Sequence, residues 1–330
     1  MSEPAIIRTS ERLAFKRCPT RWHWGWRMGL VPKGEIANAL WFGTGIHYAL
    51  AEWYCGPGAK RGPHPSETWE KWVGDSLRYM RTATSDNYQE DKYIEARALG
   101  TAMLSGYISL YGNDDSWSVI APETSFQISI PSRSGNRILA TYAGTFDLVY
   151  RDLKDDRIRL GEHKTAKIID TKHLPLDDQA GSYWAVASTI LENTGELKKG
   201  EVIESINYNF LRKALPDERP KNGLGQRLNK NGTVSKIQPP PLFLREEVYR
   251  SPRERSNQIE RIAAEASWMN AIRTGKAPLY KTPTRDCSWD CSFYEMCLLH
   301  ERGGNDWRDY KKEMYKVEDP YSAHRSRKSA

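Results

Sequence analysis

Residues 137–166 read RILATYAGTFDLVYRDLKDDRIRLGEHKTA. Two parts of this segment, 137–150 and 157–166, are rich in β-branched and aromatic side chains, so each predicts a strand. The polar link DLKDD at 152–156 is typical of a hairpin turn. We therefore expect two neighbouring strands that fold back on each other.

Three charged side chains gather on this hairpin. Asp147 closes the sequence GTFD late in the first of these strands, and Glu162 and Lys164 flank His163 late in the second. Residues two apart in a strand share a face, so Glu162 and Lys164 project together. His163 then points to the opposite face, while its backbone carbonyl stays beside Glu162. Hairpin pairing places Asp147 next to this group.

This group predicts a divalent metal site. Two carboxylates and a carbonyl oxygen are the hard ligands that Mg²⁺ or Mn²⁺ prefers. A lysine beside the ion can orient or deprotonate an attacking water, or stabilise a charged phosphate. The alternative is an ordinary ion pair on an edge strand, because Glu-x-Lys occurs by chance in many proteins.

Two helical motifs support the metal site. Gln179 and Tyr183, four residues apart in a predicted helix, share a helix face and can reach one substrate phosphate or base. Ordinary packing is the alternative for this pair. His47 ends the sequence GTGIH in an earlier predicted helix, and its imidazole as a ligand would favour Mn²⁺ beside Mg²⁺. A buried core histidine is the alternative for His47.

The remaining segments predict helices before the hairpin and alternate between helix and strand after it. The predicted helices are 11–15 (capped by Ser10), a turn that begins at Pro19, 36–55, 67–85, 90–111, 175–192 and 252–274; the predicted strands are 119–130, 137–150, 157–166, 202–212 and 242–249. The segment 56–66 predicts a loop. This order indicates an α/β fold with a mixed sheet. We divide the chain into an N-terminal helical region 1–116, a core 117–250 and a C-terminal segment 251–330.

The amino-acid composition favours a negatively charged binding partner. The chain has 49 Lys and Arg against 42 Asp and Glu, a formal charge of +7, and a basic surface suits a phosphate backbone. The insert 213–241 is rich in Pro and Gly and basic, which makes it a candidate for an extra backbone contact; a solvated loop is the alternative. We expect no membrane-spanning helix, because no run of 18 apolar residues occurs. The first residues carry no apolar signal core, which favours the cytoplasm.

The five cysteines are Cys18, Cys55, Cys287, Cys291 and Cys297. An odd count without an export signal argues against a disulfide framework. Cys287-x3-Cys291-x5-Cys297 together with Cys18 supplies four thiolates, a full ligand set for a [4Fe–4S] cluster or Zn²⁺. The 3+1 division suits a cubane cluster better than the paired spacing common at zinc sites. Zinc and free buried thiols remain the alternatives.

The motifs together resemble RecB-like nucleases of the PD-(D/E)XK type. Similar families are the CRISPR-associated and phage-encoded RecB-like exonucleases and the nuclease domain of AddB-type helicase-nucleases. The motifs that carry the resemblance are, in order, RLAFKRCP from Arg12, GTGIH, GTFD, EHK, the Gln179–Tyr183 pair and the last three cysteines. The resemblance covers residues 12–297. In this chain the first two late cysteines are separated by three residues, where two are often found in this family.

The resemblance implies a restriction-endonuclease-like core, with a central mixed sheet flanked by helices, an N-terminal helical elaboration and a C-terminal iron–sulfur segment. It implies the following ligands and roles: a [4Fe–4S] cluster on Cys18, Cys287, Cys291 and Cys297; a Mg²⁺ or Mn²⁺ site of His47, Asp147, Glu162 and the His163 carbonyl; Asp147, Glu162 and Lys164 as the catalytic residues; and Gln179 and Tyr183 on the DNA.

The activity that follows from the resemblance is a metal-dependent DNA exonuclease. We expect it to act on single-stranded or frayed DNA ends in recombination, replication or repair, with recombination or replication proteins as possible partners. Two alternatives stay open. One is a catalytically silent DNA-binding module that keeps the fold and the cysteine-bound metal. The other is a zinc-stapled interaction protein without a nucleic-acid role.

Overall fold

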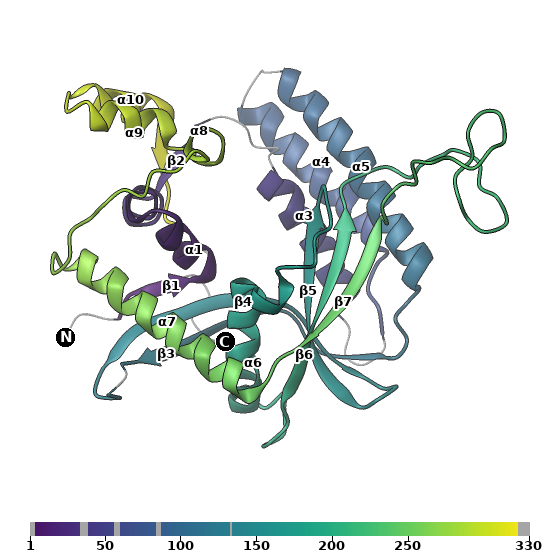
Figure 1. Ribbon diagram of the computed structural model, residues 1–330, viewed down its shortest axis with the longest axis horizontal. Helices are drawn as coiled ribbons and strands as arrows, with labels where there is room; N and C mark the ends of the chain where they lie inside the picture. Colours follow the sequence, from purple (N-terminus) through teal and green to yellow (C-terminus); the bar gives the residue numbers. More distant parts are fainter. Residues whose placement is uncertain (1–3, 34–38, 56–59, 84–86, 133, 323–330) are drawn as a thin grey trace.

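One six-stranded mixed sheet forms the centre of the computed structural model, which describes residues 4–33, 39–55, 60–83, 87–132 and 134–322 (Figure 1). The strand order is β1-β4-β5-β6-β7, with β3 paired to β4. The strands are β1 (Ile6–Arg8), β3 (Trp117–Pro131), β4 (Ile138–Asp152), β5 (Arg157–Ala166), β6 (Ile203–Arg212) and β7 (Phe243–Tyr249). β1 runs parallel to β4 and β5 parallel to β6, while the other pairs are antiparallel. The predicted mixed sheet is confirmed.

Helices cover both faces of this sheet. Three pack on one face around a buried aromatic core: α3 (Ala39–Trp53), α4 (Pro65–Ala83) and α5 (Asn87–Tyr111). The other face is covered by α1 (Thr9–Arg17), α6 (Asp178–Thr194) and α7 (Pro252–Arg273) around a second core. The two cores meet the sheet from opposite sides because strand side chains alternate between its faces. This layering confirms the expected fold class.

Capping residues fix where the later helices begin. Ser251 accepts a hydrogen bond from the backbone of Glu254, and Glu254 bonds back to the Ser251 N–H, so α7 begins at Pro252 as predicted. Asp177 caps α6 by accepting from Gln179. The predicted helix 175–192 begins later because a 3₁₀ turn, η2 (Leu174–Leu176), precedes the cap.

The N-terminal segment differs in detail from its prediction. Ser10 does not cap the first helix: α1 already includes Thr9, and the Glu11 carboxylate accepts from the Arg8 N–H. A new turn does begin at Pro19, as predicted, in α2 (Pro19–Trp22), and the π-helix η1 (His23–Arg27) continues it. Residues 36–38, 56–59, 84 and 85 of the predicted helices and loop lie outside the described residues.

Both ends of the chain contribute to one small unit beside α1 (Figure 1). It contains α8 (Cys287–Asp290), α9 (Tyr294–Glu301) and α10 (Asp306–Met314), and β2 (Leu30–Pro32) pairs there with β8 (Tyr315–Val317). Trp24 and Leu30 from the N-terminal side pack against Phe293, Met296 and Tyr315. The described helices include none with the length and apolarity needed to cross a membrane.

The insert between β6 and β7 projects away from the sheet as a pair of loops (Figure 1). Two isolated bridges, Lys221 with Arg227 and Leu228 with Val234, close its turns. The insert is therefore folded upon itself rather than against the core.

Candidate active site where two strands part

The candidate site lies where β4 and β5 separate. Their antiparallel ladder stops at the pair Leu148 and Gly161, one residue short of Asp147 and Glu162. Beyond this point β5 pairs only with β6, through register partners such as Glu162 with Tyr208. The separation leaves room for side chains between the strands, and the residues predicted from the sequence lie there.

Asp147 is held by two hydrogen bonds. Its Oδ1 lies 3.2 Å from His47 Nδ1, and its Oδ2 accepts from the backbone N–H of His163 at 2.8 Å. Burial alone would raise the pKa of Asp147, but His47 and these hydrogen bonds outweigh burial and keep the pKa low. Burial alone would lower the pKa of His47, but the charge of Asp147 and its hydrogen bond raise this pKa to about 9. Asp147 is therefore an anion at neutral pH, beside a histidine cation.

Glu162 and Lys164 project together from β5, as predicted. The Glu162 side chain is buried, and its Oε1 accepts from Lys164 Nζ at 2.6 Å. Burial raises the pKa of Glu162 well above its ordinary value, although Lys164 opposes this. Burial would lower the pKa of Lys164, but the nearby carboxylates of Glu162 and Asp177 outweigh it and raise that pKa. Lys164 is therefore a cation with a fixed orientation.

The predicted helical pair lies beside this group, in two different roles. Gln179 Oε1 accepts from Lys164 Nζ at 3.1 Å, so the amide contacts the lysine. Tyr183 packs against Phe126 and Phe146, with ring centroids 5.7 and 6.1 Å away. Gly144 permits this approach, because a Cβ there would lie 2.7 Å from Tyr183 Cε1. The motif GTFD thus needs its glycine to admit the tyrosine.

The donor set fits a hard divalent cation. Glu162 Oε2 is buried and has no hydrogen-bond partner within the described part of the chain. An unpaired buried carboxylate oxygen is costly, and a bound cation would satisfy it. No three His, Cys, Asp or Glu side chains among the described residues are close enough to hold an ion by themselves. Mg²⁺ needs only one or two carboxylates beside waters and a carbonyl oxygen, which Asp147, Glu162 and His163 can offer.

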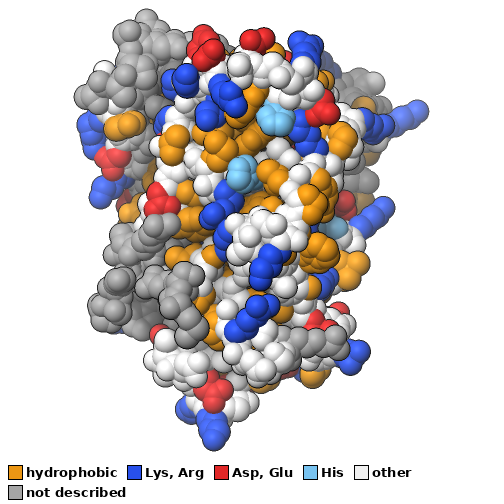
Figure 2. All heavy atoms as spheres, turned by 90° about the vertical axis from the view of Figure 1, so that its left-hand side faces the viewer, with side chains coloured by type: hydrophobic (Ala, Val, Ile, Leu, Met, Phe, Trp, Pro, Cys, Tyr) orange, Lys and Arg blue, Asp and Glu red, His pale blue; other side chains and the backbone are white. Residues whose placement is uncertain are grey.

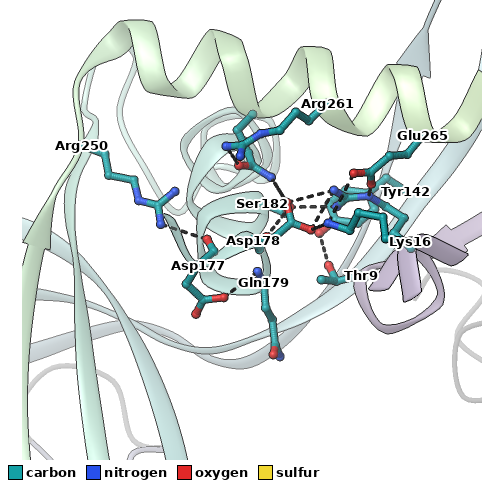
Figure 3. Close-up of polar contacts among 12 residues, drawn as sticks. Thr9, Lys16, Tyr142, Asp177, Asp178, Gln179, Ser182, Arg250, Arg261 and Glu265 are labelled. Carbon is teal, nitrogen blue, oxygen red and sulfur yellow. Dashed lines mark hydrogen bonds and ion pairs between the residues drawn. The ribbon is translucent and has the colours of Figure 1, made fainter. Parts of the chain in front are cut away.

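The start of α6, which carries Gln179, is anchored from α1 and α7 (Figure 3). The Arg12 side chain is fully buried, and it donates to Asp178 at 3.1 Å, to Glu265 at 2.6 Å and to Ser182 Oγ at 2.8 Å. The sequence motif around Arg12 contributed to the resemblance but gave the arginine no role. The one sequence signal for such a role is the position of Arg12 on the helix face that also carries the buried Phe15.

The four cysteines of the 3+1 pattern line one cavity of about 500 Å³ between α1 and α9. None of the five cysteines is in a disulfide, and Cys55 lies outside this cavity, exposed after α3. The backbone N–H of Thr284 donates to Cys287 Sγ and lowers the pKa of that thiol, while burial raises the pKa of Cys291 and Cys297. Figure 2 views the molecule from the side of this terminal unit and shows hydrophobic side chains exposed among Lys and Arg.

The comparisons with known proteins agree with this geometry. No curated protein matches the sequence. A family model, described as the PD-(D/E)XK nuclease superfamily, matches residues 10–298, which is most of the chain and includes every residue of the candidate site. Membership implies metal-dependent hydrolysis of phosphodiester bonds. With the mixed sheet, the parted strands and the carboxylate–lysine group in place, the chain belongs to the PD-(D/E)XK nuclease superfamily.

Proposed function

We propose that the protein is a Mg²⁺- or Mn²⁺-dependent exonuclease that degrades DNA from single-stranded or frayed ends, in recombination, replication or repair. The observation that carries the proposal is the buried Oε2 of Glu162, which finds no hydrogen-bond partner among the described residues and interacts electrostatically with the Asp147 anion. Asp147, Glu162 and the His163 carbonyl would hold the cation. His47, whose Nδ1 lies 3.2 Å from Asp147, is the candidate for a further ligand, and it would have to give up its ring proton to bind the cation.

A divalent ion at this position supplies an activated water and offsets the charge of the phosphate transition state. The protein's own groups do the rest. Lys164, charged and bonded to both Glu162 and Gln179, donates toward the scissile phosphate and stabilises its growing negative charge. Its raised pKa favours this role over that of a general base, because a base must release its proton near neutral pH.

A pocket between α3 and α4 supports an unpaired strand as substrate. Trp41, Tyr48, Trp72 and Tyr79 line it together with Lys71, and its volume is about 470 Å³. We call it the aromatic pocket. Tyr48 directly follows His47 on α3, so the aromatic pocket lies around that helix from the catalytic group. Aromatic rings stack on any base, and a nearby lysine suits a phosphate.

The cysteine cavity supports an iron–sulfur cluster as a structural part of the enzyme. Four thiols from both ends of the chain face a space with largely apolar walls that include Trp24, Phe293 and Leu298. A cluster there would link segments more than 250 residues apart and contribute folding free energy. Zinc is the alternative occupant, and iron and sulfide analysis of the purified protein distinguishes the two.

The test of the activity uses DNA labelled at the 5′ or the 3′ end, single-stranded or duplex, with Mg²⁺ or Mn²⁺. The wild type should shorten single strands progressively, and Glu162→Gln should lose several kcal/mol of transition-state stabilisation, on the order of a thousandfold in rate. Glu204→Gln, the same change at a half-exposed position on β6, is the matched control. Full activity of Glu162→Gln, or internal cleavage alone, would contradict the proposal, and binding without cleavage by the wild type would indicate a silent DNA-binding module.

A further inference from the structure

A buried chain of hydrogen bonds reaches the candidate site on the face of the sheet that α3 and α5 cover. It begins at Asp114 in the turn between α5 and β3, which receives two hydrogen bonds from Arg245 on β7, at 2.6 and 2.8 Å. It ends at His163 on β5, whose Nδ1 lies 2.8 Å from Asn209 Nδ2. Between them lie Tyr54 and Tyr107, which are fully buried.

The direction of each hydrogen bond in this chain is fixed by its two ends. Arg245 can only donate, so the amide atom that faces its Nε at 3.4 Å must be the Asn209 oxygen. The Asn209 NH₂ group then faces both Tyr107 Oη, at 3.1 Å, and the His163 ring. An NH₂ group has no lone pair to offer, so His163 Nδ1 must accept and the ring proton must lie on Nε2.

The two tyrosines complete the chain. Tyr107 Oη accepts from Asn209 and from Arg245, at 2.6 Å, and so its own proton points to Tyr54 Oη 2.7 Å away. Tyr54 in turn donates to Asp114 at 2.6 Å. The Arg245 guanidinium also lies 3.7 Å from the ring centroid of Tyr111. Every donor named here has an acceptor, which makes the arrangement rigid.

His163 lies where the sheet itself gives little support. Its peptide N–H donates to Asp147 Oδ2, and on that side β5 has already left β4. On the other side its register partner on the parallel strand β6 is Asn209, whose side chain bonds to the histidine ring. Tyr54 also stacks on the ring, with an interplanar angle of 15°. The ring is thus held between Asn209 on β6 and Tyr54, which directly follows α3.

We infer that Asn209 is a positioning residue of the active site: it fixes the ring and tautomer of His163, and thereby the backbone that binds Asp147 and offers its carbonyl to the metal ion. Asn209 does not touch the substrate or the ion. The part of this inference that concerns metal binding rests on the proposed function; the part that concerns His163 and Asp147 does not.

The chain offers a matched control two residues earlier. Asn207, also on β6 and also buried, donates to Tyr150 Oη at 2.6 Å, and its partner on β5 is Gly161. Asn207→Leu and Asn209→Leu therefore each remove a buried amide that bonds to a tyrosine. Only the second change frees His163. Asn209→Asp keeps the shape but replaces the NH₂ donor with an acceptor.

The first measurement is nitrogen NMR of histidine-labelled protein without metal, with the His163 signal assigned by its loss in His163→Gln. The wild type should carry its proton on Nε2, and Asn209→Asp should place a proton on Nδ1. A wild-type ring with its proton on Nδ1 would overturn the inference. The second measurement is amide hydrogen exchange at His163, which should quicken in Asn209→Leu and stay unchanged in Asn207→Leu.

The third measurement is Mn²⁺ binding, followed by electron paramagnetic resonance. Asn209→Leu should weaken binding by about 10–100-fold, the usual effect of losing an outer-shell partner, while Asn207→Leu should match the wild type. Equal effects of the two leucine variants on exchange and on Mn²⁺ would reduce Asn209 to a general packing role and overturn the inference. A wild type that binds no Mn²⁺ would contradict the proposed function, and the NMR and exchange results would still decide the role of Asn209.

Discussion

Lys164 Nζ lies 3.1 Å from Gln179 Oε1, so the first turn of α6 holds the lysine that projects from β5. The two residues come from separate elements of the sequence, and the 3₁₀ turn η2 lies between them. The amide oxygen and the Glu162 carboxylate together direct the ammonium group. In the proposed nuclease, Gln179 would therefore act on catalysis through Lys164.

We predict that Gln179→Leu lowers kcat by up to about a hundredfold, because misplacing a catalytic group by about 1 Å can cost that much. KM should change little if the amide contacts only the lysine. Gln179→Glu should retain most activity, since a carboxylate oxygen can still accept from the ammonium. Steady-state kinetics on a labelled single strand measure both constants. A large rise in KM with an unchanged kcat would instead assign Gln179 to substrate binding, as the sequence motif suggested.

Arg12 is the second target. We predict that Arg12→Leu destabilises the protein by about 1–3 kcal/mol, because it removes the fully buried member of this ion-pair cluster and leaves Lys16 as the charged partner of Asp178 and Glu265. Arg97→Leu removes an exposed ion pair with Glu70 and should cost less than about 1 kcal/mol. Urea unfolding followed by tryptophan fluorescence measures both changes. Similar losses in the two variants would refute the anchoring role of Arg12.

The aromatic pocket predicts a loss of strand affinity. Tyr79 is 64% exposed, and Tyr79→Ala should weaken binding of a single-stranded oligonucleotide by about 1–3 kcal/mol if a base stacks there. Tyr249→Ala, at a comparably exposed tyrosine on β7, is the control. Fluorescence anisotropy without divalent metal avoids cleavage during the measurement. Equal affinity of Tyr79→Ala and the wild type would exclude this ring as a stacking site.

The cysteine cavity predicts that Cys287→Ala and Cys55→Ala have different effects on metal content and thermal stability. If the proposed cluster is bound, Cys287→Ala should lose its iron and sulfide and lower the melting temperature, since a cluster in this cavity would join both ends of the chain. Cys55→Ala should keep both, because Cys55 lies outside the cavity and is exposed. Metal analysis and thermal unfolding of each purified variant provide the readout. Retention of a full cluster in Cys287→Ala would remove Cys287 from the ligand set.

The strand hairpin and the side chains that it presents could be predicted from the amino-acid sequence. Alternation in 157–166 puts Glu162 and Lys164 on one face, and the hairpin predicted from the polar link at 152–156 brings Asp147 next to them. The first residue of α7 could also be predicted from nearby residues, because Pro252 and the capping pair Ser251 and Glu254 lie within one helical turn. These predictions succeeded because the information lay within a few residues of the element concerned.

The surroundings of those side chains could not be predicted, because they depend on the packing of distant segments. The early end of the β4–β5 ladder, the Lys164–Gln179 contact and the pairing of Asn209 with His163 depend on how whole elements pack. The three-residue strand β1 was missed because it is too short to show a period, and its partner on β4 lies more than 130 residues away. The periodicity of a short segment determines on which face of a strand or helix a side chain lies. The residues that this side chain contacts come from distant segments, and these contacts form only when the sheet and helices pack together.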